Sequence, residues 1–148
     1  MTLILSEQDL KALYSDPVSM DALQARIEQA QLAYHRGSIP SQHHLQMPLV
    51  APDRQIRILA ATLPEAGENV RVNPQFRGVR DRHMNFLFDG QSGDLQAVIA
   101  GGELNVWRTA APAGLACRYL AQPGTKTIAV LGSSRQARGQ IVSISRTV

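Results

Sequence analysis

The chain has 148 residues, enough for one domain with a substantial core; 44% are apolar and 18% charged, which is typical of a globular protein and excludes a disordered one. Because the net charge of +3 is modest and aromatic residues make up only 5%, we expect no nucleic-acid partner and interpret the basicity as solvated surface with a few anion contacts. No secretory signal precedes the first helix and no stretch approaches the length of a membrane span, so we expect a cytoplasmic protein without a membrane partner.

Metal and nucleophile chemistry find little support in the sequence. Cys117 is the only cysteine, which excludes an intrachain disulfide and a cysteine metal cluster, and we expect it to be a buried small side chain. His43, His44 and His83 lack partners at metal-ligand spacing, so no metal site is predicted. No serine stands in a nucleophile elbow and no close pair of acids suggests acid–base work, so we assign no catalytic residue.

The N-terminal third predicts helices. Ser6 and Asp9 are typical of a helix start, with a serine N-cap and an acid in the first turn. Asp16 and Pro17 then favour a second start, because aspartate caps a helix and proline suits its first position. An apolar stripe at spacings of three and four predicts a helix buried on one side that stops near Gly37; it comprises Met20, Leu23, Ile27, Ala30 and Tyr34.

The middle of the chain has the pattern of strands. Three segments are strand candidates of decreasing clarity, and two further apolar runs flank a Gly- and Asp-rich connection that is typical of a hairpin. The predicted strands are His44–Val50, Gln55–Leu63, Val70–Val72, Met84–Phe88 and Leu95–Ala100. Asn73–Arg82 carries proline, glycine and four charged residues and is predicted to be a loop.

The last third predicts a helix, a strand and a second helix. Asn105 is a suitable cap for a helix that runs to about Leu120, where Pro123 and Gly124 follow as breakers. The apolar run Thr127–Leu131 then precedes a Gly/Ser turn and the helix-compatible Arg135–Ser145. A buried strand, a tight turn and a helix form the opening βα unit of a dinucleotide-binding domain.

The turn at Gly132 is the first candidate site. Gly132 permits a tight turn, and the backbone amides of Ser134 to Gln136 are expected to face a phosphate at the helix N-terminus. Ser134 stands where the nucleotide-binding pattern prefers a second glycine, so its Cβ narrows the approach of a pyrophosphate. The alternative is a turn that serves packing alone and binds no nucleotide.

Arg108 is the second candidate. An arginine in the first turns of a helix is unfavourable to the helix dipole, which suggests placement for an anion, and a fixed guanidinium suits a carboxylate or phosphate. The alternative is a surface arginine that covers Trp107. Pro112 removes the amide that bonds the carbonyl of Arg108, so we expect a kink that re-aims the arginine.

Together these segments resemble the ornithine cyclodeaminase/mu-crystallin family. Leu3–Leu10 is similar to the opening of that family, and the remaining matches agree with it in order and spacing over essentially the whole chain. They are Phe86–Gly93 for an "LFDxxTG" hairpin, Leu104–Ala111 for "LTxxRTAA", Arg118–Ala121 for a "+YLA" helix end and Gly132–Ala137 for a "GxGxQA" loop.

The resemblance implies an α+β N-terminal domain for substrate binding and dimerisation, at residues 1–122, followed at 123–148 by the first βα unit of a Rossmann-type domain. It implies NAD(P) as cofactor, a small amino or imino acid as substrate and a homodimer. The leading activity is conversion of ornithine to proline and ammonia. Alanine dehydrogenase and ketimine reductase are alternatives within the family.

Site residues follow from the same resemblance. Arg108 matches the arginine that meets the substrate carboxylate and the cofactor. Arg71 stands where a lysine contacts substrate; it keeps the charge but cannot transfer a proton at neutral pH. The implied cofactor loop comprises Gly132, Ser133, Ser134, Arg135 and Gln136, of which the last two match the pair that touches NAD. At two further positions, Gln42 and Arg80, the chain departs from the family pattern.

The family's ribose-binding acid and catalytic aspartate fall beyond Val148. A second hypothesis is therefore a catalytically silent product that retains only a dimerisation and ligand-binding domain. On that hypothesis we expect the 148-residue chain to show no ornithine turnover and weak NAD binding.

Overall fold

The computed structural model describes residues 1–39, 44–49, 51, 53–63, 67–78 and 82–148. The chain divides into two compact units. The first consists of Met1–Leu10 and Ala33–Gly102, and the second of Lys11–Leu32 and Glu103–Val148. The predicted positions Gln42, His43 and Arg80 lie outside the described residues.

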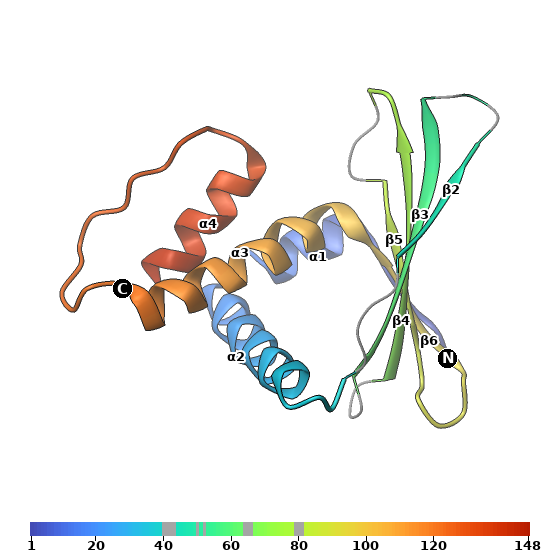
Figure 1. Ribbon diagram of the computed structural model, residues 1–148, viewed down its shortest axis with the longest axis horizontal. Helices are drawn as coiled ribbons and strands as arrows, with labels where there is room; N and C mark the ends of the chain where they lie inside the picture. The colour runs from blue at the N-terminus through green and yellow to red at the C-terminus, as the bar shows by residue number, and fades with distance from the viewer. Residues whose placement is uncertain (40–43, 50, 52, 64–66, 79–81) are drawn as a thin grey trace. The chain divides into compact units, whose positions relative to one another are not determined.

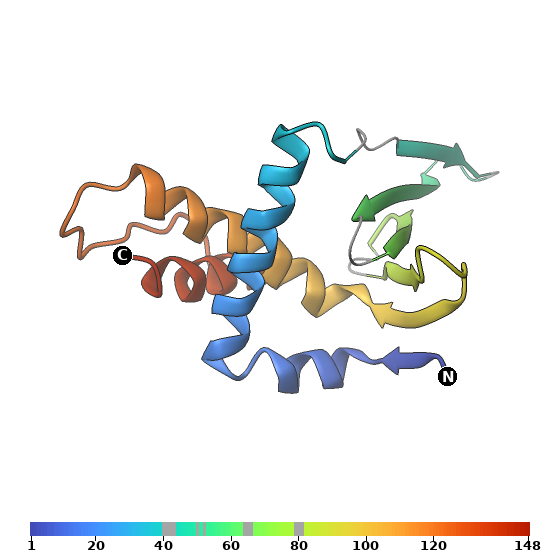
Figure 2. The same cartoon turned by 90° about the horizontal axis from the view of Figure 1, so that it is seen from below.

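A six-stranded sheet in the order β1-β6-β5-β4-β3-β2 dominates the first unit (Figure 1). Its strands are β1 (Leu3–Leu5), β2 (His44–Pro48), β3 (Arg54–Leu63), β4 (Gly67–Phe76), β5 (Met84–Phe88) and β6 (Leu95–Ala100). Neighbouring strands are antiparallel except β1, which pairs parallel to β6 at one edge (Figure 2). The sequence predicts no strand at Leu3–Leu5, because three residues are too few to show a period.

The hairpin between β5 and β6 confirms the sequence prediction. The Asp89 carboxylate accepts hydrogen bonds from the amides of Gln91 and Ser92, at 2.9 and 2.8 Å, and from Gln96 Nε2 at 2.9 Å. These bonds favour the ionised carboxylate and lower the pKa of Asp89, with the backbone amides as the largest cause. A short polar side chain therefore closes the turn that joins the two strands.

The prediction of a loop from Asn73 to Arg82 is wrong for its first four residues. β4 continues to Phe76 and pairs with β3 along its whole length, including Pro74 opposite Ile56. Its pairing with β5 ends at Val72, so beyond that point β4 pairs on one side only within the part of the chain that the structure describes. Proline is tolerated there because the missing amide interrupts no ladder on the unpaired side.

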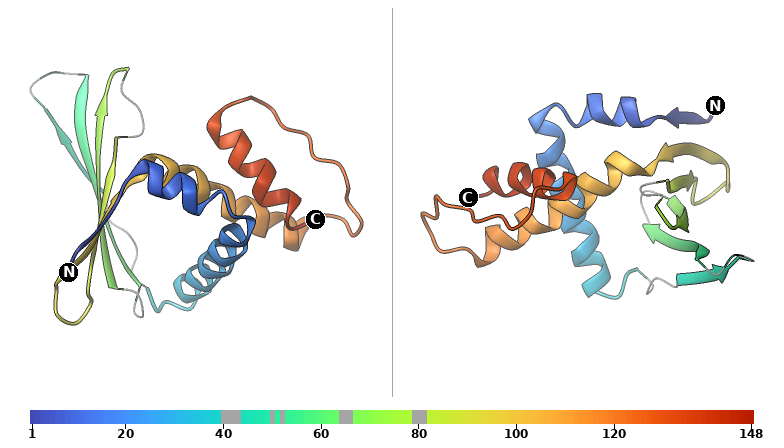
Figure 3. Two further views of the ribbon diagram at one scale, coloured as in Figure 1. Left: turned by 180° about the vertical axis from the view of Figure 1, so that it is seen from behind. Right: turned by 90° about the horizontal axis from the view of Figure 1, so that it is seen from above.

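In the second unit three helices pack together, namely α2 (Pro17–His35), α3 (Gly101–Leu120) and α4 (Arg135–Ser145). Figure 3 shows α4 beside α3, with α2 crossing both. Their core contains the buried residues Met20, Val106, Trp107, Ala110 and Ala111, against which Tyr14, Leu23, Ile27 and Val142 pack. The predicted stripe of α2 is therefore buried in part, whereas Tyr34 remains exposed. Cys117, expected to be buried, is only partly so.

Helix starts agree with the sequence for α1 (Glu7–Leu13) and α2 but not for α3. Ser6 and Asp9 form a reciprocal cap, since Ser6 Oγ accepts from the Asp9 amide at 3.2 Å and the Ser6 amide donates to Asp9 Oδ2 at 2.8 Å. Asp16 Oδ1 accepts from the Val18 amide at 3.0 Å. Both caps are local, so the sequence could predict them.

α3 begins four residues before the predicted Asn105 cap, at Gly101. The Gly101 amide donates to the His83 carbonyl at 2.9 Å, and the Gly102 amide donates to Glu7 Oε1 at 2.6 Å. A carboxylate from a segment distant in sequence thus satisfies the helix N-terminus, where the helix dipole favours negative charge. Asn105 lies inside the helix, and Arg108 lies in its second turn.

The prediction of a strand at Thr127–Leu131 is also wrong. After α3 the chain runs as an open loop and returns to α4 without strand pairing (Figure 1). A strand forms only where another strand takes up its backbone hydrogen bonds. None of the six described strands pairs with this run. The helix that follows spans Arg135–Ser145 as predicted.

Candidate functional site

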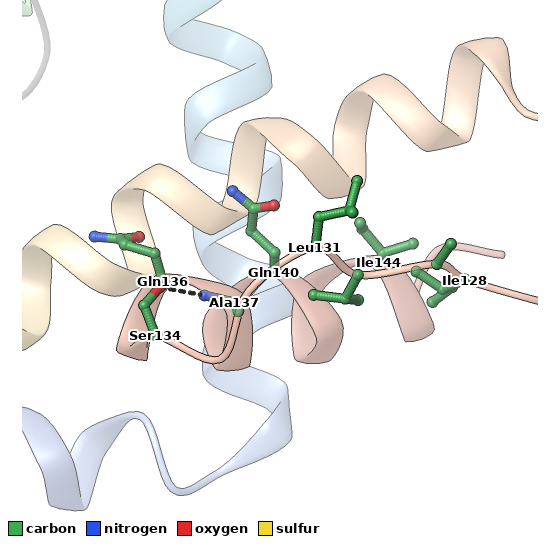
Figure 4. Close-up of a pocket in the computed structure, with 9 residues that line it drawn as sticks. Ile128, Leu131, Ser134, Gln136, Ala137, Gln140 and Ile144 are labelled. Carbon is green, nitrogen blue, oxygen red and sulfur yellow. Dashed lines mark hydrogen bonds between the residues drawn. The ribbon is translucent and has the colours of Figure 1, made fainter.

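The N-terminus of α4 has the geometry of the predicted turn. Gly132 has φ of 107°, in the left-handed region that favours glycine, and a Cβ at this position would meet open space. Ser134 is the N-cap: its Oγ accepts from the Ala137 amide at 3.3 Å, and its backbone is extended (φ −74°, ψ 170°) (Figure 4). Ser134 Oγ therefore accepts the hydrogen bond of the third helical amide, that of Ala137, and the amides of Arg135 and Gln136 can donate to other acceptors.

The side chain of Arg135 turns to α3. Its Nη2 donates to Glu103 Oε1 at 2.8 Å, and the Glu103 side chain is buried while that of Arg135 is about half exposed. Glu103 Oε2 also accepts from Trp107 Nε1 at 3.3 Å. One buried carboxylate thus joins the first turn of α4 to the first two turns of α3.

The side chain of Gln136 contacts the backbone of α3. Its Nε2 lies 3.4 Å from the Asn105 carbonyl oxygen, while its Oε1 is buried and makes no hydrogen bond within the described residues. Arg135 and Gln136, the pair implied to touch the cofactor, are therefore both held by the segment of α3 that carries Arg108.

The Arg108 side chain bonds to Asn105. Its Nε donates to Asn105 Oδ1 at 3.2 Å and its Nη2 donates to the same oxygen. Partial burial lowers the pKa of Arg108, yet a guanidinium remains protonated at neutral pH. Two of its five N–H donors are used in this way, which fixes the plane of the group and leaves donors for an acceptor in solution.

The alternative interpretation of Arg108, a cover for Trp107, is not what the helices show. The indole stacks on Tyr14, with ring centroids 5.3 Å apart, and the guanidinium of Arg138 lies 5.8 Å from its centroid on a different helix. Trp107 is thus covered by residues of α4 and of the segment before α2.

A shallow pocket lies beside α4, where the chain from Ile128 to Leu131 passes the helix (Figure 4). Its volume is about 230 Å³, and Ser134, Gln136, Ala137, Gln140 and Ile144 line its helical side. Pockets for drug-sized ligands usually have about 300–1,000 Å³, so this one alone is too small for a dinucleotide. Helix N-termini are common anion sites in proteins, which makes the turn before α4 the candidate position for one phosphate group.

Arg71 belongs to the first unit and lies in the middle of β4. Its cross-strand neighbours are Leu59 on β3 and Asn85 on β5. Side chains at paired positions point to the same face of a sheet, so Arg71 and Asn85 share a face. Asn85 is 7% exposed, and its Nδ2 makes no hydrogen bond within the described residues.

Three residues of the candidate site could not be named from the sequence. They are Glu103, which binds Arg135, Asn105, which accepts from Arg108 instead of capping the helix, and the buried Asn85. Glu103 carried a signal, because an acid is expected in the first turn of a helix, but the predicted start at Asn105 placed it outside. Asn85 carried none, since a single asparagine in an apolar strand does not indicate burial.

A turn with a glycine at positive φ before a capped helix is a geometry that many nucleotide-binding proteins use to hold a phosphate. The family model of the ornithine cyclodeaminase/mu-crystallin family matches residues 10–148, and the chain belongs to that family. None of the described helices combines the length and apolar character needed to cross a membrane.

The chain is 32% identical over 108 residues to a Δ¹-pyrroline-2-carboxylate reductase of Bacillus cereus, an alignment that covers 70% of this chain and 32% of that protein. Among solved structures, the probable ornithine cyclodeaminase of Bordetella pertussis superposes with a TM-score of 0.84 at 25% identity, over 99% of this chain and 45% of that one.

A third comparison shows the fold alone. The Thermococcus litoralis Δ¹-pyrroline-2-carboxylate reductase, solved with NADH and L-proline, superposes with a TM-score of 0.79 at 24% identity, over 99% of this chain and 46% of that one. The chain thus spans about a third of the curated relative and under half of the solved chains.

Proposed function

We propose that the chain forms the substrate-binding part, and the first cofactor-facing turn, of an NAD(P)-dependent enzyme that acts at the α-carbon of an amino or imino acid. The observation that carries this proposal is the clustering of Arg108, Arg135 and Gln136 around one segment of α3. Residues 1–122 are assigned to the substrate domain and 123–148 to the start of the cofactor domain.

The residues have distinct tasks in this proposal. Arg108, oriented by Asn105, offers a guanidinium suited to the substrate carboxylate. Within the sheet unit, Arg71 offers a guanidinium of the same chemistry. Gly132, Ser133 and Ser134, with the amides at the start of α4, receive a phosphate of the cofactor. Bound NAD(P) supplies or accepts the hydride at the α-carbon.

Two reactions fit the family and share one product. In the first, ornithine is oxidised at its α-carbon, the side-chain amine closes the ring, ammonia leaves, and hydride return to the cyclic imine gives proline. In the second, the cyclic imine Δ¹-pyrroline-2-carboxylate is taken up and reduced directly. The relative from Bacillus cereus favours the second as a candidate beside the first.

Paired assays test the proposal. The protein is incubated with ornithine and NAD⁺, or with Δ¹-pyrroline-2-carboxylate and NADH, and proline and ammonia are measured. Proline with ammonia from the first mixture supports the cyclodeaminase reaction, and proline from the second mixture alone supports the reductase. Binding of L-proline by calorimetry without turnover in either mixture supports the hypothesis of a silent ligand-binding domain. If the protein shows no turnover and does not bind L-proline, the cyclodeaminase, the reductase and the silent-domain hypotheses are all contradicted.

A homodimer formed through the sheet is part of the proposal. One face of the sheet carries half-buried apolar side chains on its four central strands, namely Ile56, Ile58, Val70, Val72, Phe86 and Val98. On the same face the edge-strand residues Ile4 and Leu45 are 73% and 55% exposed. An extended apolar face of this kind is typical of an interface, and a second copy supplies an equal apolar face to cover it.

A further inference from the structure

The observation that points further concerns a buried amide beside a charged side chain on β5 and β4. Asn85 is 7% exposed and its Nδ2 makes no hydrogen bond within the described residues, although buried amides in proteins almost always do. An amide nitrogen carries two N–H donors, so burial without an acceptor is costly. Such a group is retained against its cost where it has a role other than packing.

The sheet register places this amide next to Arg71. Arg71 and Asn85 are directly paired across β4 and β5, and side chains at such positions lie about 4.5–5.5 Å apart at their Cβ atoms. The next residues of the same cross-strand row are apolar, Leu59 on β3 and Ile99 on β6. The row therefore places the neutral donors of Asn85 beside the charged group of Arg71 on one side and the apolar Ile99 on the other.

We infer that Asn85 is a substrate-binding residue, whose Nδ2 donates to a carboxylate oxygen of the bound amino or imino acid beside the guanidinium of Arg71. A carboxylate accepts at two oxygens and has lone pairs for both groups at once. The inference rests on the proposed function and adds to it a neutral donor, whose hydrogen bond is stronger to a charged carboxylate oxygen than to the carbonyl oxygen of an acid amide. Asn85 binds and orients the acid and takes no part in proton transfer.

The experiment compares two ligands on the full chain and its variants. L-Proline and L-prolinamide share the ring and amine, and only the first has a carboxylate. The readout is the ratio of their dissociation constants by calorimetry, because partial unfolding weakens both ligands equally and leaves the ratio unchanged. The variants are Asn85→Leu, Asn85→Asp and, as a control on the same face of the sheet, Asn69→Leu.

We expect the wild-type chain and Asn69→Leu to prefer L-proline. In Asn85→Leu the preference falls at least about tenfold, the loss of one hydrogen bond to a charged group. In Asn85→Asp it falls further, because two carboxylates repel each other, and this near-isosteric variant tests the inference even where leucine perturbs the fold. Without ligand, Asn85→Leu has a higher Tm than the wild-type chain, because an apolar side chain replaces a buried amide.

Three results would overturn the inference. An unchanged preference in both Asn85 variants contradicts it and leaves the proposed function intact. An equal loss in Asn69→Leu shows that the sheet face, rather than Asn85, sets the preference. A wild-type chain that prefers neither ligand contradicts the proposed function as well, which separates the two failures.

Discussion

Arg135 and Glu103 form an ion pair, with Nη2 and Oε1 2.8 Å apart, and this pair fixes the first turn of α4 to the first turn of α3. The same carboxylate accepts from Trp107 Nε1, so it anchors the indole at the centre of the helical core as well. The position of the candidate cofactor turn is therefore set by a residue on another helix.

The first prediction concerns Glu103→Gln. The amide keeps an acceptor for one of the two donors but loses the charge, so we expect the free energy of unfolding to fall by about 1–3 kcal/mol. Urea denaturation followed by tryptophan fluorescence measures the change, since Trp107 is the only tryptophan. The control is Glu28→Gln, which weakens a more exposed pair with Arg118 and should change stability by less than about 1 kcal/mol. Equal effects of the two variants would contradict a special role of Glu103.

The second prediction concerns Gly114→Ala in α3. A Cβ at this position would lie 2.8 Å from the Ser143 carbonyl oxygen and closer still to the Gln24 and Ser143 side chains. We expect a loss of about 1–3 kcal/mol from overpacking, although alanine is the better helix former. The exposed Ala116→Ser on the same helix is the control, with a change within about 0.5 kcal/mol. A stabilised Gly114→Ala would show that α4 is packed less closely than described.

The third prediction concerns Arg108. Replacement by methionine removes the charge and the donors, so we expect L-proline to bind roughly tenfold to a hundredfold more weakly. Arg26→Met is the control, because it removes an exposed arginine that donates a hydrogen bond to Gln29 on its own helix. Calorimetry with L-proline measures both variants, and equal affinities would remove Arg108 from the site.

The fourth prediction concerns pH. The pKa of Asp89 is lowered in the folded chain by the amides of Ser92 and Gln91, so ionised Asp89 favours the folded state. Its contribution is present above the ordinary aspartate pKa of about 3.9 and is lost as the pH falls through the lower folded value. Asp89→Asn should therefore lower Tm at pH 6 and lower it less at pH 2. A difference that is constant across this range would contradict the assignment.

The fifth prediction concerns the apolar sheet face. Val72→Glu places a charge in the middle of that face, and we expect it to convert a dimer to a monomer in sedimentation at micromolar concentration. Asn69→Glu adds the same charge on the opposite face of the same strand and should leave the dimer intact. A wild-type chain that sediments as a monomer would contradict the proposed dimer.

What the sequence could predict was set by local interactions. The caps at Ser6 and Asp16 and the Asp89 turn are formed within a few residues, so their residue types indicate them directly. The start of α3 could not be predicted, because the carboxylate at its N-terminus comes from Glu7. The length of β4 depends on pairing with β3, which overrides the local preference of Pro74.

In the candidate site, too, the sequence predicts the local features but not the contacts between helices. The cap at Ser134 and the positive φ of Gly132 follow from their residue types. The partners of Arg135 and Arg108 depend on how α3 and α4 pack, and no pattern in the sequence specifies Glu103 or Asn105 for those roles. The Thr127–Leu131 run shows the converse, because strand propensity without a partner strand produces no strand.

Gln24 connects the beginning of the helical unit with its end, since its Nε2 donates at 3.0 Å to both the carbonyl and the hydroxyl of Ser143, 119 positions later. During synthesis, that amide leaves the ribosome long before its partner exists. The helical core can therefore close only after residue 143 has emerged, and the earlier helices remain incompletely packed until then. Formation of the helices alone therefore does not complete this unit, because its core also requires the closure of a loop of more than a hundred residues.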